Sequence, residues 1–301
     1  MNMRRLLMRR LLTGCSLGLP VLLAGCSLLP STRHLPVPQA PATVQNATPE
    51  ELVAQLNKSW DALNTITAKV NILASITKPK EGSVTTEPAF TANVLLSKPE
   101  MLRVYARVPV LGTEMFDMAT DGKNFTLYVP SKKEAVKGPN ALTRRSPNEF
   151  ENMRPAFFYD AMAVRGLSSD ELYSVTADSE TIEDPQKKHL LSKAEYVLSI
   201  MRTLPSGRQL KPVRVVTFDR SDLKPYQQDI YDADGNLETQ VFYANYSDFN
   251  GVIYPSTITI KRPLESYQIV LTVLTVTENQ SLDHDEFVVD VPAGTKVKNL
   301  D

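Results

Sequence analysis

The chain has 301 residues, 42% of them hydrophobic, which is enough for one large domain or two small ones. Its formal net charge is −1. The segment before Cys26 holds four of the 33 basic residues and none of the 34 acidic ones, so the remainder carries −5 (29 basic against 34 acidic). A mildly acidic chain without a basic run argues against nucleic acid as a partner.

The N-terminus predicts an export signal. Four arginines between Arg4 and Arg10 precede an apolar stretch, residues 11–23, that is too short to span a bilayer comfortably. The sequence Leu23-Ala24-Gly25-Cys26 then resembles the lipobox of bacterial lipoproteins, in which the peptide is cut before the cysteine and the new N-terminus is acylated. The alternative is an ordinary secretory signal with an incidental cysteine.

The lipobox resemblance implies that residues 1–25 are a signal peptide and that Cys26 is the site of lipid attachment, through which the protein contacts the membrane. Ser27 follows the cysteine, where Asp would imply retention in the inner membrane. The resemblance therefore implies the periplasmic face of the outer membrane. The Pro-rich stretch that follows, to residue 47, predicts an extended tether.

A capped helix is predicted after the tether. Thr48 is a candidate N-cap, Pro49 occupies the first helical position and Glu51 completes a capping box, with an end expected near Asn64. The only tryptophan, Trp60, falls on the apolar stripe of this helix. It either anchors the helix on a sheet or forms part of a ligand cavity.

Alternating residues then predict strands over 66–76 and 90–96, followed by a three-stranded meander between residues 98 and 130. Asp121-Gly122 is a strong hairpin signal within the meander. The other turn has an apolar tip, Val110-Leu111. This tip either folds against its own sheet or is an exposed finger that touches lipid or another protein.

The middle of the chain predicts a polar loop over 131–145 and a second helix with a candidate N-cap at Ser146. Its aromatic stripe includes Phe150 and Phe157, which suits either core packing or a lid over an apolar pocket. A short helical turn capped by Ser168 is expected next.

From residue 195 the pattern is nearly all β, with seven strands expected. The run 267–277 is apolar on both faces, so we expect it to be covered on both sides or to line a cavity on one. The predicted fold class is mainly β (α+β). It is an open, incomplete antiparallel β-barrel, or strongly curved sheet, of about ten strands with helices over its concave face. Residues 48–301 are expected to form a single domain. The expected strands are 196–202, 212–219, 227–231, 237–246, 256–261, 267–277 and 286–291.

Catalytic signals are weak throughout the sequence. The three histidines are His34, His189 and His284, and only His284 has acidic neighbours on both sides, in a segment expected to be solvated. The sequence has no G-x-S-x-G, H-E-x-x-H or Gly-rich phosphate motif. We therefore expect no enzyme activity, no cofactor and no metal.

Several features in order resemble the LolA/LolB superfamily of periplasmic lipoprotein carriers and outer-membrane lipoprotein receptors. They are the capped helix, Lys98-Pro99, Asp121-Gly122-Lys123 with the following Phe125-Thr126-Leu127-Tyr128, and the closing segment 287–294, FVVDVPAG. The resemblance implies an apolar cavity under a helical lid, which accepts the acyl chains of a lipoprotein or lipid without catalysis.

The resemblance also implies roles for particular residues. Leu111 matches the protruding leucine of the receptor, so Val110 and Leu111 are candidates for a membrane-inserting loop, and a soluble periplasmic carrier protein is an implied partner. This chain has one extra residue between Pro109 and Leu111 and a longer C-terminal half. Strand parity and the helix stripes nominate the lipid-cavity residues Trp60, Val94, Leu96, Leu102, Val104, Phe116, Met118, Phe125, Leu127, Phe150 and Phe157.

Two other functions stay open at this point. The chain could be an envelope assembly or stress-sensing lipoprotein that uses the same sheet as a docking module. An envelope hydrolase is the third reading, and it would need a polar cluster inside the cavity.

Overall fold

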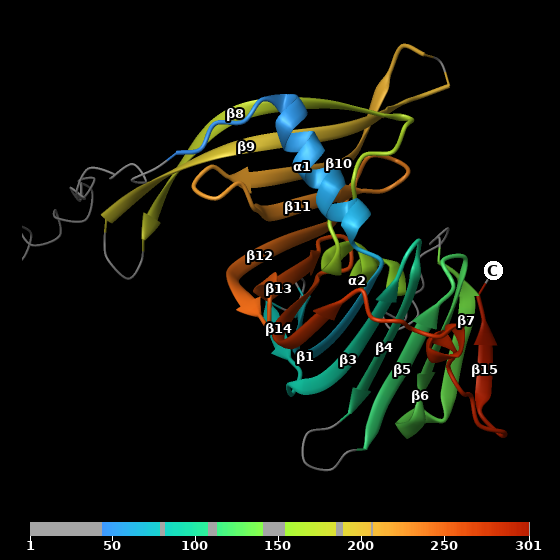
Figure 1. The fold of residues 1–301 in the computed structure, drawn as a ribbon. Coiled ribbons are helices and arrows are strands. Elements are labelled where there is room, and N and C mark those ends of the chain that lie inside the picture. The colour runs from blue at the N-terminus through green and yellow to red at the C-terminus, as the bar shows by residue number, and fades with distance from the viewer. Residues whose placement is uncertain are drawn as a thin grey trace, which may run out of the picture.

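The computed structural model describes residues 44–78, 82–107, 113–140, 154–184, 189–205 and 207–300. A single curved sheet of 15 strands dominates it, with two α-helices packed against the sheet (Figure 1). In the described chain the end strands of the path, β15 and β8, do not pair with each other, so the sheet is open. The strand order is β15-β7-β6-β5-β4-β3-β1-β14-β13-β12-β11-β10-β9-β8, with β2 paired to β1 alone.

The strands follow the sequence in two antiparallel runs that meet where β1 pairs with β14. Among the strands that the structure describes, β15 alone is parallel to its neighbour, β7. The strands are β1 (Thr65–Lys78), β2 (Ser83–Thr86), β3 (Phe90–Ser97), β4 (Met101–Arg107), β5 (Glu114–Thr120), β6 (Asn124–Val129), β7 (Glu134–Pro139), β8 (Glu171–Asp184), β9 (His189–Thr203), β10 (Leu210–Asp219), β11 (Pro225–Tyr231), β12 (Leu237–Phe249), β13 (Val252–Arg262), β14 (Tyr267–Glu278) and β15 (Lys296–Asn299).

Cross-strand register places the apolar residues of successive strands on one inner face. Ile66 of β1 lies opposite Leu96 of β3, and Leu96 lies opposite Leu102 of β4. In the other direction Ile72 lies opposite Leu271 of β14, which lies opposite Ile258 of β13. Directly paired residues share a face, so the inner face is continuous across the middle of the sheet.

Helix α1 (Pro49–Ala62) covers one part of this face. Its capping box is present: the Thr48 hydroxyl accepts from the Glu51 N–H (3.2 Å), and the Glu51 carboxylate accepts from the Thr48 N–H (2.8 Å). The helix buries Leu52, Val53 and Leu56, and burying one such side chain contributes about 1.5–3 kcal/mol. The sheet residues in this cluster are Tyr196, Leu198, Ile200, Val216 and Phe218 of β9 and β10.

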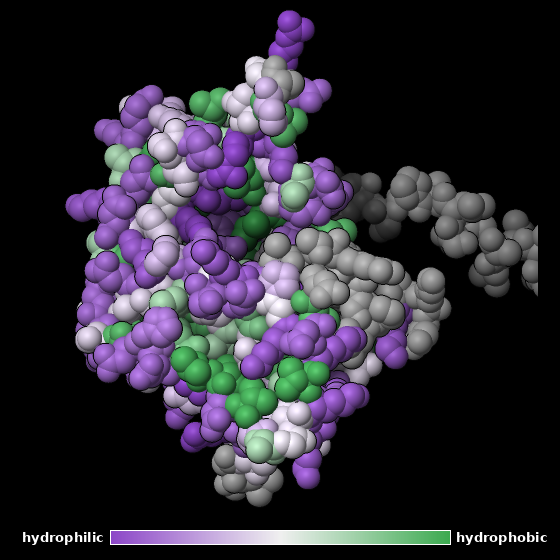
Figure 2. Space-filling view, turned by 90° about the vertical axis from the view of Figure 1, so that its right-hand side faces the viewer, coloured by the Kyte–Doolittle hydropathy of each residue, from purple (hydrophilic) through white to green (hydrophobic). Residues whose placement is uncertain are grey.

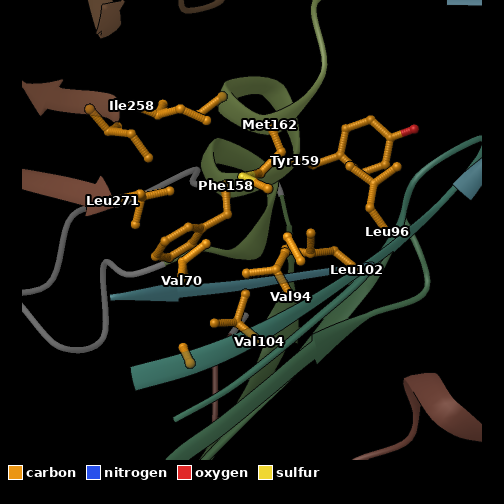
Figure 3. Close-up of a cluster of buried hydrophobic side chains, with 14 of the residues drawn as sticks. Val70, Val94, Leu96, Leu102, Val104, Phe158, Tyr159, Met162, Ile258 and Leu271 are labelled. Carbon is orange, nitrogen blue, oxygen red and sulfur yellow. The ribbon is translucent and has the colours of Figure 1, made fainter. Parts of the chain in front are cut away.

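Helix α2 (Pro155–Met162) occupies the concave side next to β4, β5 and β13. It buries Phe158, Tyr159 and Met162 among the inner residues of the sheet (Figure 3), and Phe157 is buried in the same cluster. The rings of Phe157 and Phe158 stack with centroids 4.4 Å apart. The prediction of two helices over the concave face of an open sheet is therefore confirmed. The second helix begins later than predicted, at Pro155 with Arg154 as its N-cap, and the predicted N-cap Ser146 lies outside the described residues.

The outer face of β4 and β5 is covered in part by the C-terminal segment. A short 3-10 helix, η4 (His284–Phe287), lies there and buries Phe287. Arg103 of β4 connects the sheet to this C-terminal segment. It pairs with Asp117 of β5 and also donates to the carbonyl oxygen of Glu286 in η4 (2.9 Å).

The structure corrects several sequence predictions in the first half of the chain. Residues 134–139 form β7 instead of lying in a loop, and β2 occupies part of the turn expected after β1. The turn expected at Ser168 is present, with the Ser168 N–H donating to the Glu171 carboxylate (3.0 Å) and the Glu171 N–H donating to the Ser168 carbonyl oxygen (3.1 Å), but it is a single turn that leads into β8 and not a helix. Both short strands and β8 lack a long apolar alternation, which explains why the pattern did not reveal them.

The C-terminal half also needs corrections. Residues 286–291, expected as a strand, hold the end of η4, while β15 follows at Lys296. The sheet has 15 strands, not about ten. The outer face of β14 is neither covered nor a cavity wall, because Leu274 is 42% exposed there.

Candidate functional site

An apolar cavity of about 290 Å³ lies between α1, the C-terminal end of α2 and the strands β10–β14. This volume is near the lower limit of the 300–1,000 Å³ that is common for small-molecule sites. The lining residues are Gln55, Leu56, Ser59, Trp60, Leu63, Ile66, Met162, Ala163, Val164, Phe218, Leu223, Lys224, Pro225, Tyr243, Tyr246, Ile253, Tyr254, Pro255 and Glu278.

Trp60 forms part of the helical wall of this apolar cavity. It is held from the other side by Lys98, whose ammonium lies 4.5 Å from the centre of the indole and donates to the Trp60 carbonyl oxygen at 2.6 Å. Of the nominated cavity residues that the structure describes, Trp60 alone lines this cavity, while Phe157 lines a separate pocket of about 330 Å³.

Three tyrosines bring hydroxyl groups to the cavity wall. Tyr246 donates to the carbonyl oxygen of Pro225 (2.7 Å), and Tyr254 donates to that of Met162. The hydroxyl of Tyr243 is buried and has no hydrogen-bond partner among the described residues. Burial raises the pKa of each of these phenols, so they remain protonated donors at neutral pH.

Glu278 is the one acidic residue in the lining of this cavity. Desolvation raises the pKa of its carboxyl group. The wall is otherwise dominated by aliphatic and aromatic side chains, which suits a chain of methylene groups better than an ionic ligand.

The other nominated residues on strands β3–β6 lie beneath α2 and not around this cavity. They form a filled core, part of which Figure 3 shows, and Phe157 of α2 belongs to the same cluster. Phe116 is only partly buried at the edge of that core, 5.8 Å from Phe90 between ring centres. The fully packed members are Val94, Leu96, Leu102, Val104, Met118, Phe125 and Leu127.

Four nominated residues lie outside the described parts of the chain. They are Cys26, Val110, Leu111 and Phe150. Lipid attachment, membrane insertion and the lid role of Phe150 therefore stay predictions.

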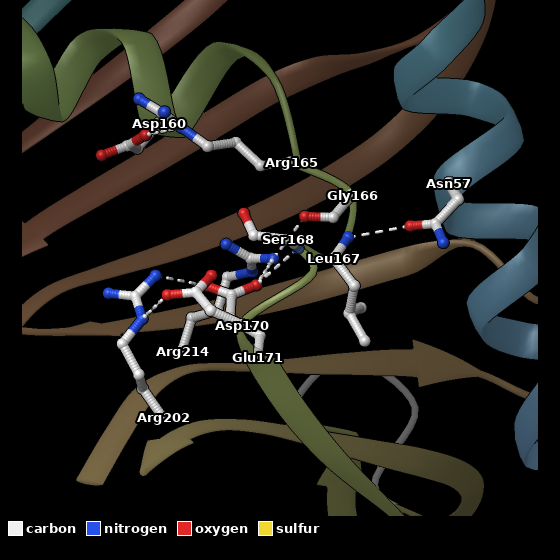
Figure 4. Close-up of polar contacts among 10 residues, drawn as sticks. All are labelled: Asn57, Asp160, Arg165, Gly166, Leu167, Ser168, Asp170, Glu171, Arg202 and Arg214. Carbon is white, nitrogen blue, oxygen red and sulfur yellow. Dashed lines mark hydrogen bonds and ion pairs between the residues drawn. The ribbon is translucent and has the colours of Figure 1, made fainter. Parts of the chain in front are cut away.

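A second, polar pocket of about 350 Å³ lies beside the segment that joins α2 to β8 (Figure 4). Arg165 binds Asp160 of α2 (2.7 Å) and Glu100 (3.2 Å). Glu171, at the start of β8, accepts from Arg214 of β10 (3.2 Å) and Arg202 of β9 (3.4 Å). The pocket is lined by Glu100, Asp160, Arg165, Ser168, Glu171, Arg202, Val213, Arg214, Gln228 and Ile230.

Sequence reasoning missed this polar pocket because β8 was not recognised. Glu171 reaches Arg214 because β8 pairs with β9, which pairs with β10, so a prediction that lacks β8 cannot place the two residues together. A usable signal was present: Arg214 lies among the apolar residues Val213, Val215 and Val216 in one strand, and a buried arginine requires a partner.

The described residues contain no group of three or more His, Cys, Asp or Glu side chains that could hold a metal ion. Among them, too, no helix is long and apolar enough to cross a membrane. Figure 2 shows the side of the molecule near β7 and β15, where hydrophilic residues predominate and hydrophobic ones are most concentrated low on the face, with others scattered above.

Comparisons with known proteins give structural likenesses only. No family model matches the sequence, and no curated protein matches it. The chain is similar in structure to a LolA superfamily protein from Nitrosomonas europaea, at 16% identity and a TM-score of 0.47, over 81% of this chain and 99% of that one.

Two further solved structures are similar to a comparable extent. One is an outer membrane lipoprotein-sorting protein domain from Vibrio parahaemolyticus, at 13% identity and a TM-score of 0.47, over 78% of this chain and 94% of that one. The other is a DUF1329 family protein from Desulfovibrio piger, at 14% identity and a TM-score of 0.46, over 79% of this chain and 94% of that one. The functional argument below rests on this chain's own cavities.

Proposed function

We propose that this protein is a lipid-anchored protein of the cell envelope that binds an acyl chain of a lipoprotein or lipid, and that it acts in lipoprotein localisation or lipid transfer without catalysis. The observation that carries the proposal is the apolar cavity under α1, with Trp60 in its wall. Residues 48–301 would act as one lipid-binding domain.

The energetics suit an acyl ligand. Each methylene moved from water into an apolar site contributes about 0.8 kcal/mol, so a few buried methylenes offset part of the cost of ordering the chain. A cavity of about 290 Å³ holds only part of a long acyl chain. Binding a whole chain therefore requires more space than the present cavity provides.

The additional space would come from movement of α2. Its apolar side chains cover the nominated residues of β3–β6, so displacing the helix would expose the inner face that they form. Polar contacts from the sheet help to hold the helix in the present state: Tyr254 donates to the carbonyl oxygen of Met162, and Gln228 donates to that of Asp160 (2.9 Å). We propose that α2 is the lid and that Phe157 borders the acyl chain when the lid is open.

Anchoring and delivery would depend on parts of the chain outside the described residues. We propose that acylated Cys26 tethers the protein to the periplasmic face of the outer membrane. Val110 and Leu111 would insert into the membrane during transfer, and a soluble carrier would supply the cargo. Replacing Leu111 by Glu should abolish delivery but leave lipid binding intact; unchanged delivery would remove the insertion role.

The binding proposal is tested by native mass spectrometry of the full chain carrying Cys26→Ala, purified from the bacterial periplasm. The expected result is co-purifying mass equal to an acyl lipid or an acylated peptide. The matched control is the same chain with Val164→Phe, which fills the cavity wall and should reduce the ligand-bound fraction. Protein that stays free of ligand after incubation with envelope lipids would contradict the proposal.

A further inference from the structure

The two edges of the sheet are built differently. At one end of the strand order, β15 has four residues, all exposed and two of them lysines. At the other end, β8 has 14 residues and pairs with β9 over its whole length without a bulge (Figure 1). Short strands, lysines, prolines and bulges are common devices that prevent a sheet edge from pairing with another chain. β15 combines two of these devices, whereas β8 has none of the four.

The regularity of β8 is a property of this edge and not of the sheet around it. The next three pairings, β9 with β10, β10 with β11 and β11 with β12, each contain a register shift. In the described chain β9 is the one strand that pairs with β8, so the outer edge of β8 faces no other strand. Successive residues of an antiparallel strand direct their N–H and C=O groups to alternate sides. The outer edge therefore presents a regular row of backbone donors and acceptors.

Part of this edge belongs to a ribbon of only two strands. β9 pairs with β10 from Thr203 to Glu195, but its pairing with β8 continues as far as Asp184 and His189. Beyond Glu195, among the described strands, β8 and β9 are therefore paired only with each other. A two-stranded ribbon is marginally stable in water, and a third strand would stabilise it.

Apolar side chains lie on both faces of β8 at its start. Leu172 is 50% exposed and Tyr173 is 37% exposed, and successive residues of a strand point to opposite faces. A strand added at this edge would cover part of both side chains. Apolar side chains are therefore favourable on both faces of the added strand near this point.

The charge of β8 has one sign. The strand contains five acidic residues and no basic one. Glu171 is buried with Arg214 and Arg202, and the other four acidic residues follow from Asp178 onward. Lys193 of β9 lies opposite Glu180 in the register and is engaged by Asp219 (3.7 Å). The lysines at positions 187 and 188, in the turn after β8, lie outside the described residues.

These features select among the possible occupants of the edge. A second copy of β8 would place one acidic strand against another, and like charges across a strand pair are destabilising. The chain's own N-terminal tether has prolines at positions 30, 36, 38 and 41, and proline cannot donate a backbone hydrogen bond to a strand. A basic extended segment of another protein has neither disadvantage.

We propose that the outer edge of β8 is a docking site for an extended, basic segment of a partner protein, which joins the sheet as an additional strand. Backbone hydrogen bonds to β8 hold the segment, and its lysines or arginines lie beside the acidic half of the strand. This role is separate from acyl binding, because none of the described residues that line the apolar cavity belongs to β8.

The test uses a fluorescein-labelled peptide, KVTVKVTVK-amide, and the full chain carrying Cys26→Ala, with binding measured by fluorescence anisotropy. We expect saturable binding that weakens with added salt. The acidic peptide EVTVEVTVE-amide should bind at least about tenfold more weakly. The same should hold for the basic peptide with N-methyl groups on two adjacent central residues, which blocks both of its edges. Equal binding of the N-methylated peptide would overturn the inference, since charge alone would then explain the affinity.

Hydrogen exchange locates the bound peptide. Backbone amides within residues 171–184 should exchange more slowly in the complex, because outward N–H groups of β8 become hydrogen-bonded. Protection confined to other strands would overturn the assignment to β8.

Two charge variants separate the edge from the net charge of the protein. Asp178→Lys and Asp61→Lys replace exposed residues and change the net charge equally, but only Asp178 lies on β8. Asp178→Lys should weaken binding of the basic peptide by about fivefold, and Asp61→Lys should leave it within about twofold. Equal effects of the two variants would contradict docking at β8.

Two proline variants test the backbone row directly. Thr176 and Ala177 are neighbours, so the N–H of one points outward and the N–H of the other points toward β9. Of Thr176→Pro and Ala177→Pro, the variant that keeps the thermal stability closer to the parent has lost the outward donor. That variant should bind the basic peptide at least about fivefold more weakly, and undiminished binding would overturn the inference.

Sedimentation of the protein without peptide tests the alternative occupant. A protein that stays monomeric at micromolar concentration agrees with a partner segment. A dimer that is lost in the better-folded proline variant would instead assign the edge to a second copy and overturn the inference.

Discussion

The ammonium of Lys98 makes two contacts with Trp60: it donates to the Trp60 carbonyl oxygen at 2.6 Å and lies 4.5 Å from the centre of the indole. Trp60 ends the buried stripe of α1, and Lys98 directly follows β3. The pair therefore joins the cavity wall to the central meander. Because Trp60 is the only tryptophan, the intrinsic tryptophan fluorescence of the chain reports on this wall alone.

Replacing Lys98 by Met should weaken this junction. The variant loses a charge-assisted hydrogen bond and a cation–π contact but keeps a side chain of similar length. We expect the free energy of unfolding to fall by about 1–2 kcal/mol. Urea denaturation followed by Trp60 emission measures it, and a loss below 0.3 kcal/mol, on the order of experimental scatter, would show that the contact with Lys98 is not stabilising.

Gly166, in the segment after α2, lies directly against α1. A Cβ added there would lie 2.8 Å from Oδ1 of Asn57 and 3.0 Å from Cδ1 of Trp60. Gly166→Ala should therefore displace the helix, reduce stability by about 1–3 kcal/mol and change Trp60 emission. Thermal unfolding and the emission spectrum of the folded protein check the two effects.

A double-mutant cycle provides the control for Gly166. Asn57 also accepts from the N–H of Leu167 (2.8 Å), so Asn57→Ala has its own cost. If the clash is real, Gly166→Ala costs less in the Asn57→Ala background than in the parent. Equal costs in both backgrounds would mean that the new methyl group does not meet Asn57.

The Arg103–Asp117 pair links the meander to the C-terminal segment. Asp117 is 4% exposed and accepts two hydrogen bonds from Arg103, at 2.9 and 2.6 Å. Asp117→Ala removes the ionic partner of Arg103, which keeps only its hydrogen bond to the carbonyl oxygen of Glu286, and should cost about 3 kcal/mol. The exposed Asp61 is a suitable control, since Asp61→Ala should change stability by less than about 0.5 kcal/mol. Similar losses in both variants in chemical denaturation would contradict this reading.

Asp121 predicts a pH dependence of stability. Its carboxylate accepts from the backbone N–H of Asn124 (2.7 Å) and of Lys123 (2.9 Å), and these hydrogen bonds hold its pKa below the ordinary 3.8. The stabilisation is thus present above pH 3.8 and is lost as the pH falls through the lowered pKa.

The matching experiment replaces Asp121 by Asn, which keeps an acceptor but cannot titrate. Unfolding free energies measured from pH 6 down to the acid transition should converge for parent and variant at the lowest pH. At pH 6 the parent should be more stable by less than about 1 kcal/mol, because the group is exposed. A constant difference across the range would exclude a role for the charge.

The sequence was informative where local chemistry dictates structure. The capping box at Thr48 and the turns at Asp121-Gly122 and Asn250-Gly251 are present in the structure. The glycines of these turns have φ of 95° and 96°, in the left-handed region that glycine adopts at low cost. Strand parity also placed Val94 and Leu102 correctly on the inner face.

The remaining features depend on contacts between distant segments. β8 is an edge strand with mostly exposed side chains, so its sequence lacks the alternation that identifies a strand. The polar pocket requires β8 to pair with β9, which brings Glu171 opposite Arg202. Parity also cannot distinguish a filled core from an open cavity, because both require apolar residues on the same face.

The central claim is that an acyl chain lies against Trp60 in the apolar cavity. The most direct test titrates the full chain carrying Cys26→Ala with stearate brominated at mid-chain, because bromine quenches an indole that it touches. Unbrominated stearate is the ligand control. Val164→Phe should weaken binding by at least about tenfold, and Leu172→Phe, at a 50% exposed site on β8, should not.

The account predicts saturable quenching of Trp60 by the brominated chain, with competition by plain stearate. Quenching that rises linearly without saturation, or that is the same in Val164→Phe as in the parent, would contradict acyl binding at this cavity.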